Sequence, residues 1–64
     1  MFEIKDAKKN LVAVGDQETG EVDARHGDRG VKFTLAEGQS ARLTRKGTVT
    51  EVIRRHGGFI VNHL

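Results

Sequence analysis

The chain has 64 residues, with 11 Lys and Arg against 9 Asp and Glu, a net charge of +2 and no cysteine. This length allows one domain and lies near the lower limit at which a single chain folds on its own. The absence of cysteine excludes disulfides and cysteine-based zinc sites. No apolar run approaches the ~18 residues of a transmembrane helix, and the early charges of Glu3, Lys5 and Asp6 are unlike a signal or transit peptide. We therefore expect a cytoplasmic protein that does not enter a membrane.

Apolar residues recur at every second position, which is the period of a half-buried β-strand. Phe2 and Ile4 begin this series, and the continuous apolar run 11–14 suits a strand covered on both faces. No window shows the i, i+3, i+4, i+7 spacing of an amphipathic helix over three turns. The sequence therefore predicts an all-β protein. In chain order, the segments with the strand pattern are 2–5, 11–14, 31–35, 41–44, 48–55 and 59–61.

Short polar segments separate these predicted strands. Residues 6–10 form a polar loop of common hairpin length, and the segments 36–39 and 45–47 each contain a glycine. The dipeptides His26-Gly27 and His56-Gly57 stand where a two-residue turn needs positive φ, which glycine accepts freely and histidine tolerates. We therefore predict antiparallel hairpins.

Two segments of the chain resemble each other. Glu21 to Val31 and Glu51 to Val61 both read E-V-x-x-R-H-G-x-x-x-V, 30 residues apart. Six of the eleven positions are identical, whereas residue frequencies of about 5–7% predict fewer than one identity by chance. We therefore predict two tandem three-stranded repeats, 1–31 and 32–64, related by a pseudo-twofold axis and joined by a continuous strand over 31–35. Because three strands are a minimum for independent stability, the repeats should share one core as a small six-stranded antiparallel barrel-like sheet.

The predicted repeats differ in charge. Residues 1–31 carry seven acids and five bases, a net −2, and residues 32–64 carry two acids and six bases, a net +4. A basic surface is typical of proteins that contact the RNA or DNA backbone. We expect Arg42, Thr44, Thr48, Thr50 and Arg54 to share one strand face, where hydroxyls would assist the cations. The predicted nucleic-acid-binding residues are Lys32, Arg42, Thr44, Arg45, Lys46, Arg54 and Arg55.

The repeated Arg-His-Gly segments are a second candidate site. Arg25, His26 and His56 could bind a phosphate or carboxylate, because arginine donates paired hydrogen bonds and histidine titrates near neutrality. The alternative is that these residues only serve turn geometry. The histidines lack HxH or HxxxH spacing, so we predict no metal site and no cofactor. No nucleophile-elbow, phosphate-loop or metalloprotease motif is present, which favours a binding protein over an enzyme.

Adjacent apolar residues predict a homo-oligomer. Val52 and Ile53 are neighbours, as are Ile60 and Val61, and neighbours in a strand point to opposite faces. A chain this short cannot cover both faces by itself, so a second copy should cover one of them. Two functions stay open. One is a nucleic-acid-binding module, and the other is a structural, assembly or protein-interaction subunit (of a ring, scaffold, virion or inhibitor) whose charges meet between subunits.

Overall fold

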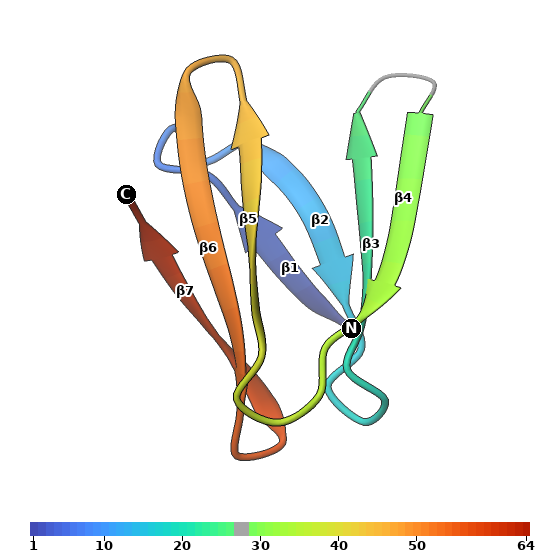
Figure 1. Ribbon diagram of the computed structural model, residues 1–64. Helices are drawn as coiled ribbons and strands as arrows, with labels where there is room; N and C mark the ends of the chain where they lie inside the picture. The colour runs from blue at the N-terminus through green and yellow to red at the C-terminus, as the bar shows by residue number, and fades with distance from the viewer. Residues whose placement is uncertain (27–28) are drawn as a thin grey trace.

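A computed structural model of the chain describes residues 1–26 and 29–64, with all their side chains except those of residues 25, 26 and 29. This part of the chain contains seven β-strands and no helix (Figure 1). They form two antiparallel meanders, sheet A with the order β1-β2-β3-β4 and sheet B with the order β5-β6-β7. The strands are β1 (Phe2–Lys5), β2 (Leu11–Gly15), β3 (Glu21–His26), β4 (Arg29–Thr34), β5 (Ser40–Arg45), β6 (Thr48–Arg55) and β7 (Gly58–His63).

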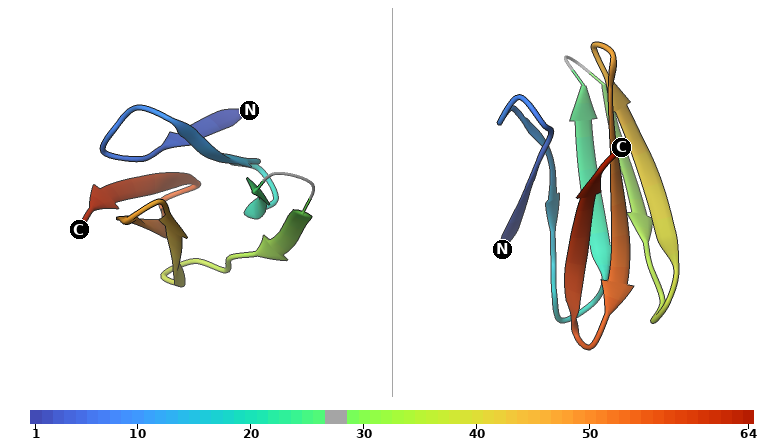
Figure 2. Two further views of the ribbon diagram at one scale, coloured as in Figure 1. Left: turned by 90° about the horizontal axis from the view of Figure 1, so that it is seen from above. Right: turned by 90° about the vertical axis from the view of Figure 1, so that its left-hand side faces the viewer.

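The two sheets face each other around one core, and residues 35–39 carry the chain from sheet A to sheet B (Figure 2). The first and last strands lie side by side, since the ring centroids of Phe2 and Phe59 are 5.6 Å apart. His63 Nε2 lies 2.9 Å from the carbonyl oxygen of Lys5. No strand of sheet A pairs with a strand of sheet B within residues 1–26 and 29–64, so the arrangement is an open sandwich.

The predicted all-β antiparallel class is confirmed, but the six-stranded barrel-like sheet is wrong. Residues 1–26 and 29–64 form seven strands in two sheets, and within these residues the sheets do not close into a barrel. The physical reason is burial, because two facing sheets cover their inner rows from both sides. The buried apolar side chains are Ile4, Val12, Ala13, Val22, Leu35 and Val52.

A β-bulge in β2 sets which of its side chains enter the core. Ile4 pairs with Ala13 and Lys5 pairs with Leu11, so Val12 is an extra residue with no partner in β1. Val12 and Ala13 are both buried in the core, whereas the side chain of Leu11 is 44% exposed. The prediction that residues 11–14 are covered on both faces is therefore wrong, because the bulge turns two consecutive apolar residues inward.

The aspartates that begin two loops also close them. Asp6 Oδ1 accepts hydrogen bonds of 2.9 Å from the backbone N–H groups of Lys8 and Asn10. In the next loop, Asp16 Oδ1 accepts from the N–H of Glu18 at 2.9 Å and of Thr19 at 3.4 Å. Aspartate favours turns for this reason, since its side chain satisfies nearby backbone donors. The predicted hairpin loop 6–10 is confirmed, with β1 ending at Lys5 and β2 beginning at Leu11.

Sheet B is a meander because it contains two tight turns. Lys46 and Gly47 have φ values of 46° and 82°, and His56 and Gly57 have 55° and 72°. Positive φ at both central residues is the type I′ geometry, whose twist matches that of paired strands. The predicted His56-Gly57 turn is confirmed. For the predicted His26-Gly27 turn, Gly27 lies outside the described residues, and the backbone of His26 pairs with Arg29.

The two proposed repeats differ in strand pairing. Glu21 pairs with Thr34, whereas the equivalent Glu51 pairs with Asn62, which is two residues nearer in sequence. β4 runs through the proposed boundary between residues 31 and 32 as one strand. At the offset of the proposed repeat, β4 corresponds to β1 and β5 corresponds to β2. β1 pairs with β2, whereas β4 does not pair with β5 in the described residues. The duplication therefore stays a prediction.

Replacing Thr50 with valine should stabilise the fold. Thr50 is fully buried, and its Oγ1 has no hydrogen-bond partner in the described part of the chain. An unpaired buried hydroxyl costs about 1–3 kcal/mol, so we expect Thr50→Val to raise the free energy of unfolding by about 1 kcal/mol in urea titrations. The exposed Thr44 is the control, and Thr44→Val should change stability by less than about 0.5 kcal/mol. A less stable Thr50→Val variant would mean that the hydroxyl has a partner in solution.

Candidate functional site

Arg54 reaches from β6 across to sheet A and binds backbone carbonyls there. Its Nη1 donates to Leu35 O at 3.3 Å, and its Nη2 donates to Gln17 O at 3.1 Å and to Glu18 O at 3.4 Å. Its Cζ also lies 5.8 Å from the centroid of the Phe59 ring, in a cation–π contact. These acceptors lie in the β2–β3 loop and at the crossover between the sheets. Arg54 therefore stabilises the packing of the sheets, and a phosphate would have to displace these bonds.

Arg45 makes a similar link near the other end of sheet B. Its Nη1 donates to Leu11 O at 2.8 Å. Beside it, the Thr48 hydroxyl donates to Arg45 O at 2.7 Å and lies 3.3 Å from Asp6 Oδ2. The two arginines thus hold sheet B to the backbone of sheet A at two separated places, which the sequence analysis did not foresee.

Strand register separates the residues that we expected on one face. The Lys46-Gly47 turn pairs Arg45 with Thr48, so Arg42 pairs with Glu51 and Thr44 pairs with Val49. Direct partners in an antiparallel pair share a face, so Arg42 and Thr44 lie on the outer face. Thr48, Thr50 and Arg54 lie on the inner face, and the expectation of a single shared face is wrong. On the outer face, Arg42 Nε is 3.9 Å from Glu51 Oε2.

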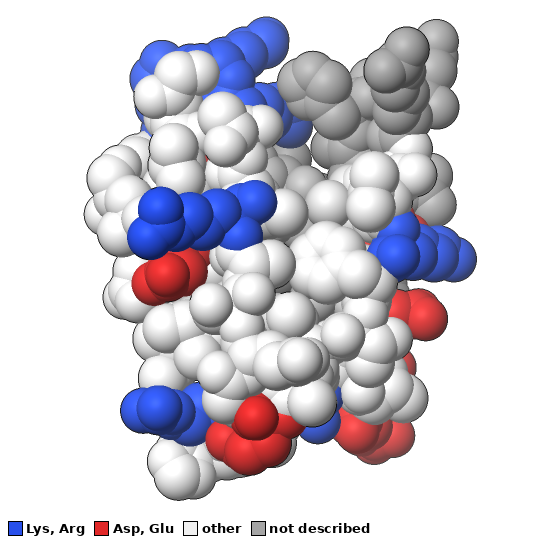
Figure 3. All heavy atoms as spheres, in the orientation of Figure 1, with Lys and Arg blue, Asp and Glu red and all other residues white. Residues whose placement is uncertain are grey.

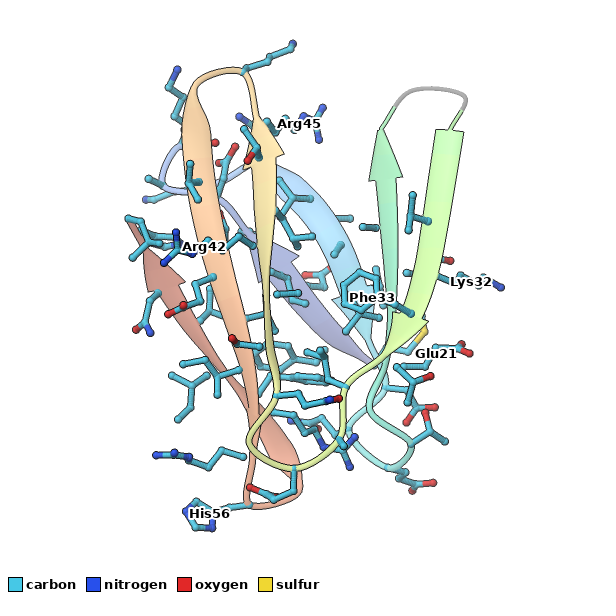
Figure 4. All side chains as sticks on the ribbon, in the orientation of Figure 1. Glu21, Lys32, Phe33, Arg42, Arg45 and His56 are labelled. Atoms are coloured by element: carbon cyan, nitrogen blue, oxygen red, sulfur yellow. The ribbon has the colours of Figure 1, made fainter. Side chains whose placement is uncertain are left out.

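The remaining predicted phosphate-binding side chains are dispersed. Lys32 and Arg42 point to opposite sides of the molecule (Figure 4). Lys46 occupies the β5–β6 turn, and Arg55 is the last residue of β6, before the β6–β7 turn. On the face shown in Figure 3, basic and acidic side chains alternate around a largely uncharged centre.

The second candidate site is only partly described. The side chains of Arg25 and His26 lie outside the described residues, so the structure does not place them against His56. The backbone N–H of His56 donates to Glu37 Oε1 at 3.0 Å and to Glu37 Oε2 at 3.1 Å. In this turn the Glu37 carboxylate therefore already accepts hydrogen bonds from the main chain.

No group of three metal-ligating side chains converges in residues 1–26 and 29–64. The same residues contain no helix that could span a membrane.

The outer face of sheet B, which we call the B face, exposes apolar side chains. Ile53 pairs with Ile60 across β6 and β7, and Ile60 is 41% exposed. Four residues away along both strands, the carbonyl of Val49 accepts a hydrogen bond from Leu64 N–H at 3.0 Å, and Leu64 is 63% exposed. A polar row separates these pairs, formed by Arg42, Glu51 and Asn62. The B face is therefore two apolar pairs with a charged row between them.

The outer face of sheet A, which we call the A face, carries more charge and has a hollow. Val14 pairs with Glu3 in β1 and with Asp23 in β3, so these three side chains form one row. Asp23 in turn pairs with Lys32. A shallow cavity of about 80 Å³ lies over β2, lined among the described residues by Leu11, Val12, Ala13, Val14 and Asp23. The bulge accounts for the hollow among the described side chains, because Val12 and Ala13 both turn inward.

The loop around Asp6 gives the fold a dependence on acid pH. The N–H of Asn10 holds the pKa of Asp6 below its ordinary value, burial opposes this shift, and bonds from Lys8 N–H and Thr48 reinforce it. A carboxyl whose pKa is lowered in the folded state stabilises the fold at pH values above its unfolded pKa of about 3.9. This stabilisation is lost as the pH falls through the folded-state pKa. Asp6→Asn should therefore destabilise the protein more at pH 6 than at pH 3, measured by urea unfolding. An equal loss at both pH values would contradict this assignment.

Comparison with family models, with curated proteins and with solved structures gives no match to this chain. Ile53 and Ile60 belong to the adjacent apolar pairs that the sequence shows, whereas no sequence pattern predicted the exposure of Leu64 or the hollow over β2. The hollow follows from a bulge, for which the sequence contains no separate signal.

Proposed function

We propose that the protein is a non-catalytic assembly subunit that associates with copies of itself, and that the B face is one contact surface. The exposure of Ile60 and Leu64, beside Ile53 and Val49 on one sheet face, carries this proposal. Exposed apolar side chains on one sheet face, here two pairs flanking a polar row, are the kind of surface at which soluble proteins interact. The polar row contains both a positive side chain, Arg42, and a negative one, Glu51. A partner that covers this row therefore does not have to bury an unpaired charge.

The small core supports this proposal independently. Six apolar residues are buried in the described part of the chain, and small scaffolds with such cores usually need oligomerisation, metals or disulfides. The chain has no cysteine, and its described residues gather no metal-ligating group. Association is therefore the stabilising device that this composition leaves open.

The solution mass as a function of concentration tests the proposal. The wild-type protein should exceed its 7.1 kDa chain mass in sedimentation equilibrium at high micromolar concentration. Ile60→Glu should weaken association at least about tenfold, because a buried isoleucine contributes roughly 1.5–3 kcal/mol. Val31, which is 60% exposed on β4, is the matched control, and Val31→Glu should leave the mass unchanged. A wild-type protein that is monomeric at every concentration would overturn the proposal.

Nucleic-acid binding is a second proposal, favoured by the composition of two strands. β4 reads RGVKFT and β5 reads SARLTR, so both contain basic residues and no acidic residue. Fluorescence anisotropy of a labelled oligonucleotide should then show binding that weakens steeply with salt. Lys32→Glu and Lys46→Glu should reduce it, because neither lysine has an ion-pair partner among the described side chains. No binding at low salt would remove this proposal.

A further inference from the structure

The outer edge of β4 presents backbone groups that no other strand binds in the described part of the chain. β4 pairs with β3 alone and is the outermost strand of sheet A (Figure 1). The N–H of Leu35 donates to Gly20 O at 2.9 Å, so the odd-numbered residues of β4 also direct their N–H and C=O groups toward β3. The N–H and C=O groups of Gly30, Lys32 and Thr34 therefore point away from β3, into the open edge.

The side chains along this edge alternate between an apolar inner row and a polar outer row. Phe33 pairs with the buried Val22, and Val31 pairs with a residue of β3 that packs against the core, Ala24. Because direct partners share a face, Val31 and Phe33 lie on the inner face. Val31 is 60% exposed and Phe33 is only half-buried, so both keep apolar area at the edge. Lys32 lies on the opposite side of β4 from Phe33 (Figure 4).

Lys32 is the charge that a strand added at this edge would meet. It is exposed, and it has no ion-pair partner among the described side chains. Its cross-strand neighbour in the sheet, Asp23, lies on the β3 side. The other side of Lys32 faces the open edge, so an added strand can place a carboxylate beside the ammonium group there.

The edges of a second copy do not suit this position. Two β4 edges in full antiparallel register would place Lys32 opposite Lys32, and like charges in that arrangement are destabilising. β5 and β7, two of the other edge strands, contain no acidic residue to meet Lys32. β1 contains Glu3, but β7 already lies beside β1, with His63 Nε2 at 2.9 Å from Lys5 O. The charge of the edge therefore favours an acidic partner of a different kind.

We propose that the β4 edge binds an extended segment of another protein, in which an acidic residue stands between two apolar residues, as an added antiparallel strand of sheet A. Strand addition takes its affinity from main-chain hydrogen bonds and its specificity from alternate side chains. The acidic residue lies opposite Lys32 and exchanges both main-chain bonds with it, while its two apolar neighbours contact Val31 and Phe33. This surface is separate from the B face, so the proposal does not depend on self-association.

Hydrogen exchange with the acetylated and amidated peptide Thr-Val-Glu-Val-Thr tests the geometry. The amides of Lys32 and Thr34 should exchange quickly in the free protein and at least about threefold more slowly at millimolar peptide, because the added strand binds them. The amides of Val31 and Phe33, which face β3, should be protected in both states. N-methylation of the peptide glutamate should abolish the effect, because its amide faces Lys32. N-methylation of a peptide valine, whose amide faces away from β4, is the control.

A charge exchange tests the acidic residue of the partner. Lys32→Glu should bind this peptide about fivefold more weakly than the wild-type protein and should instead prefer Thr-Val-Lys-Val-Thr, since unlike charges directly opposite attract and like charges repel. Lys46→Glu changes the charge equally in the β5–β6 turn, so it is the matched control and should bind as the wild-type protein does. Urea unfolding checks that both variants are folded.

Three results would overturn the proposal, each for a different reason. If the peptide does not bind at millimolar concentration, the edge takes no acidic strand. If N-methylation of its glutamate has no effect, charge alone holds the peptide. If the amides of Lys32 and Thr34 are protected in the free protein increasingly with protein concentration, a second copy covers the edge. The effect of Ile60→Glu on the solution mass tests the B face separately, so failure of one proposal is distinguishable from failure of the other.

Discussion

We expect Gly20→Ala to lower the free energy of unfolding by about 3 kcal/mol, measured by urea or thermal unfolding. Gly20 has a φ of +83°, at which an alanine costs about 1–2 kcal/mol. Its surroundings add to this cost, because a Cβ would overlap Arg54 Nη1 and the carbonyl oxygen of Leu35. Neither neighbour can move freely, since they are hydrogen-bonded to each other, and Leu35 N–H donates to Gly20 O at 2.9 Å.

Gly38 is a matched control for this prediction. Its φ is +84°, and an added Cβ would meet nothing within 4 Å. Gly38→Ala therefore tests the backbone cost alone, which should be about 1–2 kcal/mol. Equal losses for the two variants would show that the close approach of Arg54 to Gly20 contributes nothing to stability.

Arg54→Ala should lower the free energy of unfolding by about 2–3 kcal/mol. Hydrogen bonds from a charged donor contribute about 1.5–3 kcal/mol each in isolation, but the partly exposed position of Arg54 and the shared geometry of its three acceptors keep the total below their sum. Arg54→Lys should recover less than half of the loss, because an ammonium group cannot reproduce the planar fork of a guanidinium.

The neighbouring Arg55 supplies the control for this second prediction. Arg55 is exposed on the outer face, so Arg55→Ala should change stability by less than about 0.5 kcal/mol. Both variants lose one positive charge, so a difference between them reports the contacts of Arg54 and not its charge. If both variants lost the same stability, long-range electrostatics would explain it and the link between the sheets would be unimportant.

Local rules predicted most of the hairpins, but the segment 36–39, which we expected to be a hairpin loop, connects the two sheets, because β4 and β5 do not pair in the described residues. The loop 6–10 and the His56-Gly57 turn follow from short polar segments and from glycine at positive φ, and both are where the sequence placed them. β3 (Glu21–His26) was not identified as a strand, although Val22 is buried and its neighbours Glu21 and Asp23 are not. Because β3 has few apolar residues, its sequence only weakly indicates a strand. Burial of Val22 against the opposite sheet stabilises it.

The candidate site was less predictable because it depends on register. A two-residue turn at Lys46-Gly47 requires that Arg45 pairs with Thr48, so an even-numbered residue of β5 always shares its face with an odd-numbered residue of β6. Once the turn is assigned to Lys46 and Gly47, this rule can be read from the sequence. It places Arg42 and Arg54 on opposite faces of sheet B. The partition into two sheets depends instead on contacts between distant segments, such as Arg54 with Gln17.

The acceptors of Arg45 and Arg54 are all main-chain oxygens, at Leu11, Gln17, Glu18 and Leu35. Every amino acid supplies the same carbonyl, so positions 11, 17 and 18 can change identity while the clamp between the layers is retained. Position 11 also forms the rim of the hollow on the A face. A substitution at position 11 would therefore change the shape of the hollow and still leave the carbonyl that Arg45 binds.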